Sequence, residues 1–105
     1  MEFNNKPIKL FASSGWNDKY GEELHTWVVA AMKVLWKYPV DMMVFEMIDE
    51  KYLQIRLAGY DFNTGELDEE TTALKVEYGP VETFWFKVDD YGDYYVGTFL
   101  FPSEY

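Results

Sequence analysis

The side chains in this sequence that could take part in catalysis are mainly acidic: there are nineteen Asp and Glu residues, one histidine (His25) and no cysteine. A histidine that acts as a general base or a metal ligand needs partners, and no second His and no Cys is present to supply them. We therefore interpret His25 as a residue on the flank of a helix. Without cysteine, thiol catalysis, thiolate metal sites and disulfide bonds are excluded.

Paired carboxylates can hydrolyse glycosides when two of them flank the scissile bond at a defined separation. The nineteen acids here include no pair that the sequence distinguishes from the others. A domain of 105 residues also offers little depth for a substrate cleft. The sequence therefore predicts that the protein is not an enzyme, and a small hydrolase is the weakest of the functional alternatives.

The segment Ser13-Ser14-Gly15 stands between an expected strand and the start of an expected helix, where backbone amides can bind an anion. It lacks the second glycine and the lysine of a nucleotide-binding loop. The acids that follow would also repel a phosphate; they are Asp18, Glu22 and Glu23. We interpret the segment as a turn whose side chains cap the local backbone.

The segment Asp61-Phe62-Asn63-Thr64-Gly65 has some features of a calcium-binding loop. Its glycine comes one position early, and Thr72 stands where the bidentate glutamate should be. An Asx-type turn is the favoured interpretation. The sequence as a whole predicts no metal and no organic cofactor.

Hydrophobic spacing predicts one principal helix near residues 18–38. Asn17 or Asp18 offers an N-cap, and Pro39 ends the helix. The positions that recur at helical spacing form one buried stripe, made of Leu24, Trp27, Val28, Ala31 and Leu35.

Apolar and polar residues alternate with a period of two in most of the remaining sequence, which is typical of half-buried strands. A first strand is expected at Ile8–Ala12. Later strands are expected near residues 43–47, 53–57, 74–78, 84–88 and 94–101. Together they predict a single compact α+β domain over residues 1–105, of order β-α-β-β-β-β-β, with a single helix packed on a mainly antiparallel sheet of about five to six strands.

The longest uncharged apolar stretch, Trp27–Met32, is far too short to cross a bilayer. The first eleven residues contain no apolar run of the length that a signal peptide requires. We therefore expect a cytoplasmic protein with no membrane partner.

The formal net charge of −10 is concentrated in the C-terminal half. Residues 1–60 hold seven basic and eight acidic side chains, whereas residues 61–105 hold two basic and eleven acidic ones. Eight of those eleven acids lie in two expected turns: Asp61, Glu66, Asp68, Glu69, Glu70, Asp89, Asp90 and Asp93. Such a surface repels nucleic acid and attracts basic proteins, although a purely solubilising role is an equally open alternative.

Carboxylates two residues apart on a strand lie roughly 6.6 Å from each other, a spacing of the same order as that of phosphates along a nucleic-acid strand. Three aromatic residues are expected on the surface, where they could anchor a partner. Trp36 lies outside the buried stripe of the helix, Trp85 alternates out of phase with its apolar neighbours, and Tyr91 stands in an acidic turn. We therefore predict a surface that binds a basic, nucleic-acid-handling protein, with no direct binding of nucleic acid.

These features favour an inhibitor that blocks the basic nucleic-acid-binding surface of its target. The profile is similar to that of phage counter-defence proteins, such as anti-CRISPR proteins and other DNA mimics, although no motif connects the chain to a family. One alternative is an immunity protein, or antitoxin, that neutralises a toxin nuclease. Another is a structural or assembly protein that self-associates. The sequence leaves a monomer and a homodimer both open.

Overall fold

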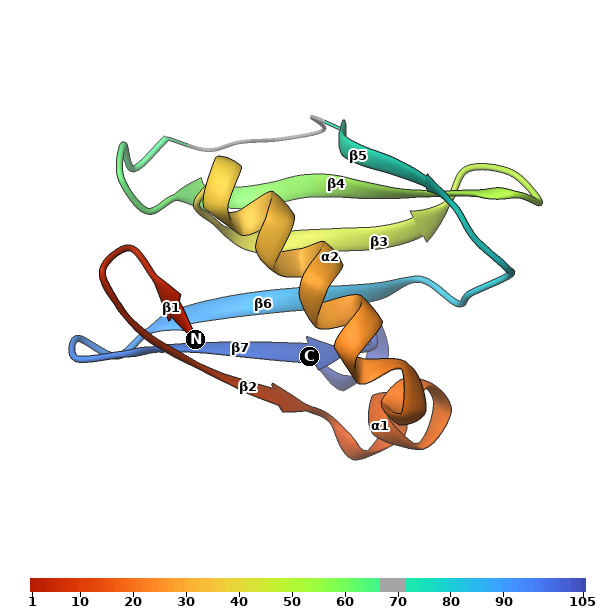
Figure 1. Ribbon diagram of the computed structural model, residues 1–105, viewed down its shortest axis with the longest axis horizontal. Helices are drawn as coiled ribbons and strands as arrows, with labels where there is room; N and C mark the ends of the chain where they lie inside the picture. Colours follow the sequence, from red (N-terminus) through yellow and green to blue (C-terminus); the bar gives the residue numbers. More distant parts are fainter. Residues whose placement is uncertain (67–71) are drawn as a thin grey trace.

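The computed structural model describes residues 1–66 and 72–105. Across these residues the chain forms a seven-stranded sheet in the order β1-β2-β7-β6-β3-β4-β5, and α2 runs across one face of it (Figure 1). The elements are β1 (Glu2–Phe3), β2 (Lys6–Ala12), α1 (Ser14–Tyr20), the 3₁₀ turn η1 (Gly21–Glu23), α2 (Leu24–Lys37), β3 (Val40–Met47), β4 (Tyr52–Asp61), β5 (Thr72–Glu77), β6 (Phe84–Asp90), β7 (Tyr95–Leu100) and the 3₁₀ turn η2 (Pro102–Glu104).

The α+β class is confirmed, and five of the six described strand pairings are antiparallel as predicted, but the predicted number and order of the strands are wrong. The sheet is mixed, because β7 returns to lie between β6 and β2 and pairs in parallel with β2, with Ile8 opposite Tyr95. β1 was not predicted, because a strand of two residues is too short to show any alternation. Asn4 and Asn5, with φ of 51° and 65°, form the tight turn from β1 into β2. Asparagine tolerates this left-handed conformation better than most residues, which suits it to such hairpin turns.

The predicted single helix is also wrong in its first part. α1 begins after Ser13, whose side chain accepts a hydrogen bond from the Trp16 amide. The N-cap is therefore Ser13 rather than Asn17 or Asp18, and the capping turn expected at residues 13–15 is confirmed. The helical path is interrupted by η1 before α2 begins.

The predicted stripe of α2 is buried as expected at Trp27, Val28, Ala31 and Leu35. Leu24 is the exception, because it stands at the first turn of α2 and is 38% exposed.

The core between α2 and the sheet is a cluster of aromatic rings around Phe84, which is fully buried. Its ring is stacked on Phe45 at 4.8 Å and meets Trp27 edge-on at 5.0 Å. Trp16 and Tyr20, both from α1, contact Phe84 from the side. α1 thus belongs to the core, and it fixes the N-terminal end of α2 against the sheet.

Candidate functional site

Three connections that are far apart in the sequence meet at one end of the sheet, on the left in Figure 1. The Asn4 side-chain amide, in the β1–β2 turn, donates to the side-chain oxygen Oδ1 of Asn63 at 3.1 Å and to the Tyr95 hydroxyl at 3.3 Å. The Phe62 ring, in the loop after β4, packs against Tyr95 at 5.2 Å and against Phe3 at 5.9 Å. The two acidic turns predicted from the sequence therefore lie side by side.

We call this region the acidic end, and it also includes the last turn of α2. Trp36 is 66% exposed there, and its indole Nε1 donates to the Glu2 carbonyl at 3.2 Å. The acidic end is defined by the described acids and exposed aromatic rings of these segments, which are Trp36, Tyr60, Asp61, Glu66, Asp90, Tyr91 and Asp93.

The β6–β7 turn is held in shape by an ion pair. Lys6 donates to an Asp90 carboxylate oxygen at 2.6 Å and to the Gly92 carbonyl at 2.7 Å. The same Asp90 oxygen accepts the Gly92 amide at 2.9 Å. The hydrogen bond from Lys6, and then that from Gly92, lower the pKa of Asp90. Asp90 therefore acts first as a structural residue of the turn.

Tyr91 projects from this turn and is 61% exposed. Its ring is stacked on that of Tyr94, with centroids 5.6 Å apart and an interplanar angle of 13°. The Lys9 ammonium lies 4.2 Å from the centroid of the Tyr94 ring. The exposed ring is thus held in one orientation by its neighbours, which lowers the entropy that it would lose on binding a partner.

We expect Asp90→Asn to remove part of the pH-dependent contribution to the stability of the fold. The pKa of Asp90 is lower in the folded protein than in the unfolded chain, where it is about 3.9. The Asp90 carboxylate therefore stabilises the fold at pH values above the unfolded pKa. This stabilisation is lost as the pH falls through the folded pKa. The difference in Tm between the parent and Asp90→Asn should therefore be largest above about pH 5 and should shrink below about pH 3. Thermal melts across this range measure it.

Asp93→Asn is the matched control, because Asp93 lies in the same turn and makes no ion pair with any described residue. If both variants show the same dependence of Tm on pH, the Lys6–Asp90 pair is not its source.

The loop after β4 contains the Asx turn that was predicted. Asp61 accepts the amides of Asn63 at 2.7 Å and Thr64 at 2.9 Å. Gly65 closes the loop with a φ of 73°. Glu66 is exposed beside it. Within residues 1–66 and 72–105, no group of three or more His, Cys, Asp or Glu side chains is arranged to hold a metal ion.

The other predicted site residues that the structure describes are less available to a partner at the acidic end, even where they lie next to it, as Asp89 lies next to Asp90 in β6. Asp89 is half-buried and accepts a hydrogen bond from Lys87 at 3.1 Å, and Lys87 also pairs with Asp41 at 3.6 Å. Asp68, Glu69 and Glu70 lie outside the described residues.

Trp85 lies near the opposite end of β6, about 16 Å along the strand from Asp90. It is half-buried and packs edge-on against Tyr105 at 5.6 Å, so its predicted exposure is wrong. Strand alternation places Trp85 off the core face, but the C-terminal residue covers it there.

A second group of acids, at the other end of the sheet, was missed by sequence reasoning. Lys19 pairs with Glu82 at 2.6 Å and Lys51 with Glu77 at 3.4 Å, and the Tyr78 hydroxyl hydrogen-bonds to Glu23. The group comprises Glu22, Glu23, Asp49, Glu50, Glu77 and Glu82. Four of its six members come from residues 1–60, where acidic and basic side chains nearly balance, so that only the fold reveals the group.

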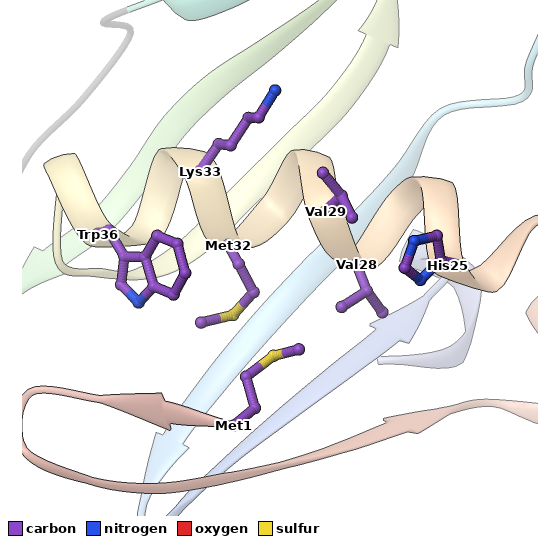
Figure 2. A pocket seen from close by; sticks show the side chains of 7 residues that line it. All are labelled: Met1, His25, Val28, Val29, Met32, Lys33 and Trp36. Carbon is purple, nitrogen blue, oxygen red and sulfur yellow. The ribbon is translucent and has the colours of Figure 1, made fainter.

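A surface hollow with a volume of about 190 Å³ lies between α2 and the N-terminal residue (Figure 2). It is lined by Met1, His25, Val28, Val29, Met32, Lys33 and Trp36. We call it the α2 groove. No pattern in the sequence predicted it, because Met1 reaches the helix only through the β1–β2 hairpin. His25, interpreted from the sequence as a helix-flank residue, is exposed at one end of the groove.

The chain matches no protein-family model, no curated protein and no solved structure at a significant level of similarity. Among the described residues, no helix has both the length and the apolar character needed to span a membrane.

Proposed function

We propose that the protein acts by binding and not by catalysis, and that its acidic end occupies the basic, nucleic-acid-binding surface of a cytoplasmic target protein and inhibits it. The observation that carries the proposal is the convergence of acids and exposed aromatic rings from separate segments on one end of the sheet. Neutralisation of a toxin nuclease would use the same surface in the same way.

The two kinds of side chain would contribute differently to such an interface. Exposed carboxylates such as Glu66 and Asp93 attract a basic surface over a distance and raise the association rate. The rings of Trp36, Tyr60 and Tyr91 are 66%, 58% and 61% exposed, and they would be buried on contact. Buried Trp and Tyr side chains carry much of the binding free energy in protein interfaces and slow dissociation.

The first test identifies the partner and measures its association rate. The protein is used to capture its target from a host lysate, the target is identified by mass spectrometry, and duplex DNA is added as a competitor. We expect a basic target, release of the target by DNA, and an association rate that falls as salt is raised, because exposed charges are screened beyond about 8–10 Å. A target that DNA does not displace would contradict the proposal.

The second test places the interface. Glu66→Lys with Asp93→Lys should slow association about tenfold at low salt and should change stability little, because both residues are exposed. Glu22→Lys with Glu50→Lys is the matched control, since it makes the same change of charge at the opposite end of the sheet. If both double variants slow association equally, the effect comes from the net charge of the protein and not from one surface. If neither double variant slows association, the acidic end is not the interface.

A further inference from the structure

One edge of the sheet is only partly covered. β1 pairs with β2 at Pro7 and Lys6, and the Ile8 amide then donates to the Met1 carbonyl at 3.0 Å. Beyond this point no described strand lies on the outer side of residues 9–12, although β7 pairs with their inner side. In Figure 1 the second half of β2 accordingly runs along the border of the sheet.

The hydrogen bonds at the two ends of this stretch show where its backbone groups point. The Ile8 amide points outward to Met1, whereas the Ser13 amide points inward to the Phe99 carbonyl at 2.9 Å. Peptide groups alternate between the two sides of a strand, so the amides and carbonyls of Leu10 and Ala12 point outward, as those of Ile8 do. This edge can therefore accept another strand for two further residue pairs.

The α2 groove runs beside this edge. Val28 and Met32 are 8% and 3% exposed and form its floor, and Val29, at 40%, lies on its rim. Met1 pairs with Ile8 and directs its side chain toward Met32 (Figure 2). Met1 thus shows how a residue paired with β2 presents its side chain to α2.

The charge of the groove is opposite to that of the protein. The net charge of the chain is −10, yet the groove's two titratable side chains, His25 and Lys33, are both basic types. Neither makes an ion pair with a described residue. A carboxylate on a ligand would therefore find an available cation at Lys33.

We propose that the α2 groove binds an extended peptide segment of another protein, which adds to β2 as an antiparallel strand beside residues 9–12. Its alternate apolar side chains lie between β2 and α2 on Val28, Val29 and Met32, and an acidic side chain or carboxyl terminus pairs with Lys33. This mode, in which backbone hydrogen bonds give affinity and a neighbouring groove gives specificity, is a general form of peptide recognition. The proposal does not depend on the acidic end, which would meet a basic partner.

The experiment begins with selection of random twelve-residue peptides, displayed on phage, against the immobilised full-length protein. We expect selected peptides with apolar residues at alternate positions and at least one acid. Their affinities are then measured by fluorescence polarisation. Ala12→Pro removes an outward amide at an edge position that tolerates proline, and it should weaken binding about tenfold.

Lys33→Glu should weaken binding about fivefold. Its matched control is Lys37→Glu, which makes the same change one turn further along α2 and outside the groove lining; its effect should stay within about twofold.

Circular dichroism and Tm establish whether Ala12→Pro folds. If it does not fold, the test is made on the ligand instead: the unchanged protein is offered a selected peptide that is N-methylated at alternate residues. Such a peptide lacks the amides that would form backbone hydrogen bonds with β2. Failure to select peptides, selection of peptides with helical spacing, or full binding by Ala12→Pro or by the N-methylated peptide would each overturn the proposal. Self-association that Ala12→Pro abolishes would also overturn it, because a second copy of the chain would then occupy the edge.

Discussion

Replacement of Phe84 by alanine should lower the free energy of unfolding by about 3–5 kcal/mol. Phe84 is fully buried, with one face stacked on Phe45 and the edge of Trp27 against it. Because its neighbours come from α1, α2 and the sheet together, a collapse around the missing ring would have to move all three. Domains of this kind have a total stability of about 5–15 kcal/mol, so this loss would be a large share of the total.

Phe11→Ala is the matched control for this prediction, because it removes the same ring from a side chain that is 55% exposed on β2. Its cost should stay within about 1 kcal/mol. Urea denaturation followed by circular dichroism measures both variants. Similar losses for Phe84→Ala and Phe11→Ala would mean that the aromatic cluster is not the centre of the core.

The faces of the strands could be predicted from the sequence because they depend on a local period. Phe84, Phe86 and Val88 alternate with Trp85 and Lys87, and the first three are buried. Such alternation requires only that one face of the strand be apolar, whatever its neighbours are.

The order of the strands could not be predicted in this way, because it depends on contacts between distant segments. Nothing local indicates that β7 returns beside β2, in parallel with it. Gly97 becomes understandable only from the folded sheet, because a Cβ atom there would overlap the Phe86 ring of β6 and would lie 3.2 Å from the Leu10 side chain of β2.

The start of the helix was misjudged because the hydrophobic stripe of α2 can be extrapolated backward without a visible break. Trp16 and Tyr20 are buried, at 0% and 6% exposure, but they belong to a separate helix that approaches the core from another direction. The capping side chain of Ser13 is a signal that the sequence does contain. This signal predicts the capping turn, and the structure shows that a helix also begins there.

The candidate site was only partly accessible to sequence reasoning. That acids gather in turns can be predicted from composition, but the fold decides which of them are available to a partner. Asp61 caps its own turn, and Asp90 is held by Lys6. Glu66 and Asp93, by contrast, are exposed. The approach of the two turns depends on the packing of Phe62, which has no local signature.

Tyr91→Ala should raise the dissociation rate of the captured target about thirtyfold, which corresponds to a loss of about 2 kcal/mol of binding free energy. Tyr91 is 61% exposed and its ring is stacked on that of Tyr94, so its removal should change the stability of the free protein little. Tyr52→Ala is the control, because Tyr52 is a 40% exposed tyrosine at the start of β4, at the opposite end of the sheet. It should leave both binding rates unchanged.

Salt separates the contribution of the Tyr91 ring from that of the neighbouring charges. The removal of exposed acids changes an attraction that acts over a distance, so the effect of Glu66→Lys with Asp93→Lys should appear in the association rate and should diminish as salt is raised. The Tyr91 ring acts only after contact, through burial, so its effect should appear in the dissociation rate and should be nearly the same at low and high salt. Binding kinetics of the two variants at both salt concentrations test this division. A salt-dependent association defect in Tyr91→Ala, or unchanged dissociation, would show that the ring is not an anchor, and the interface would then have to be sought away from the β6–β7 turn.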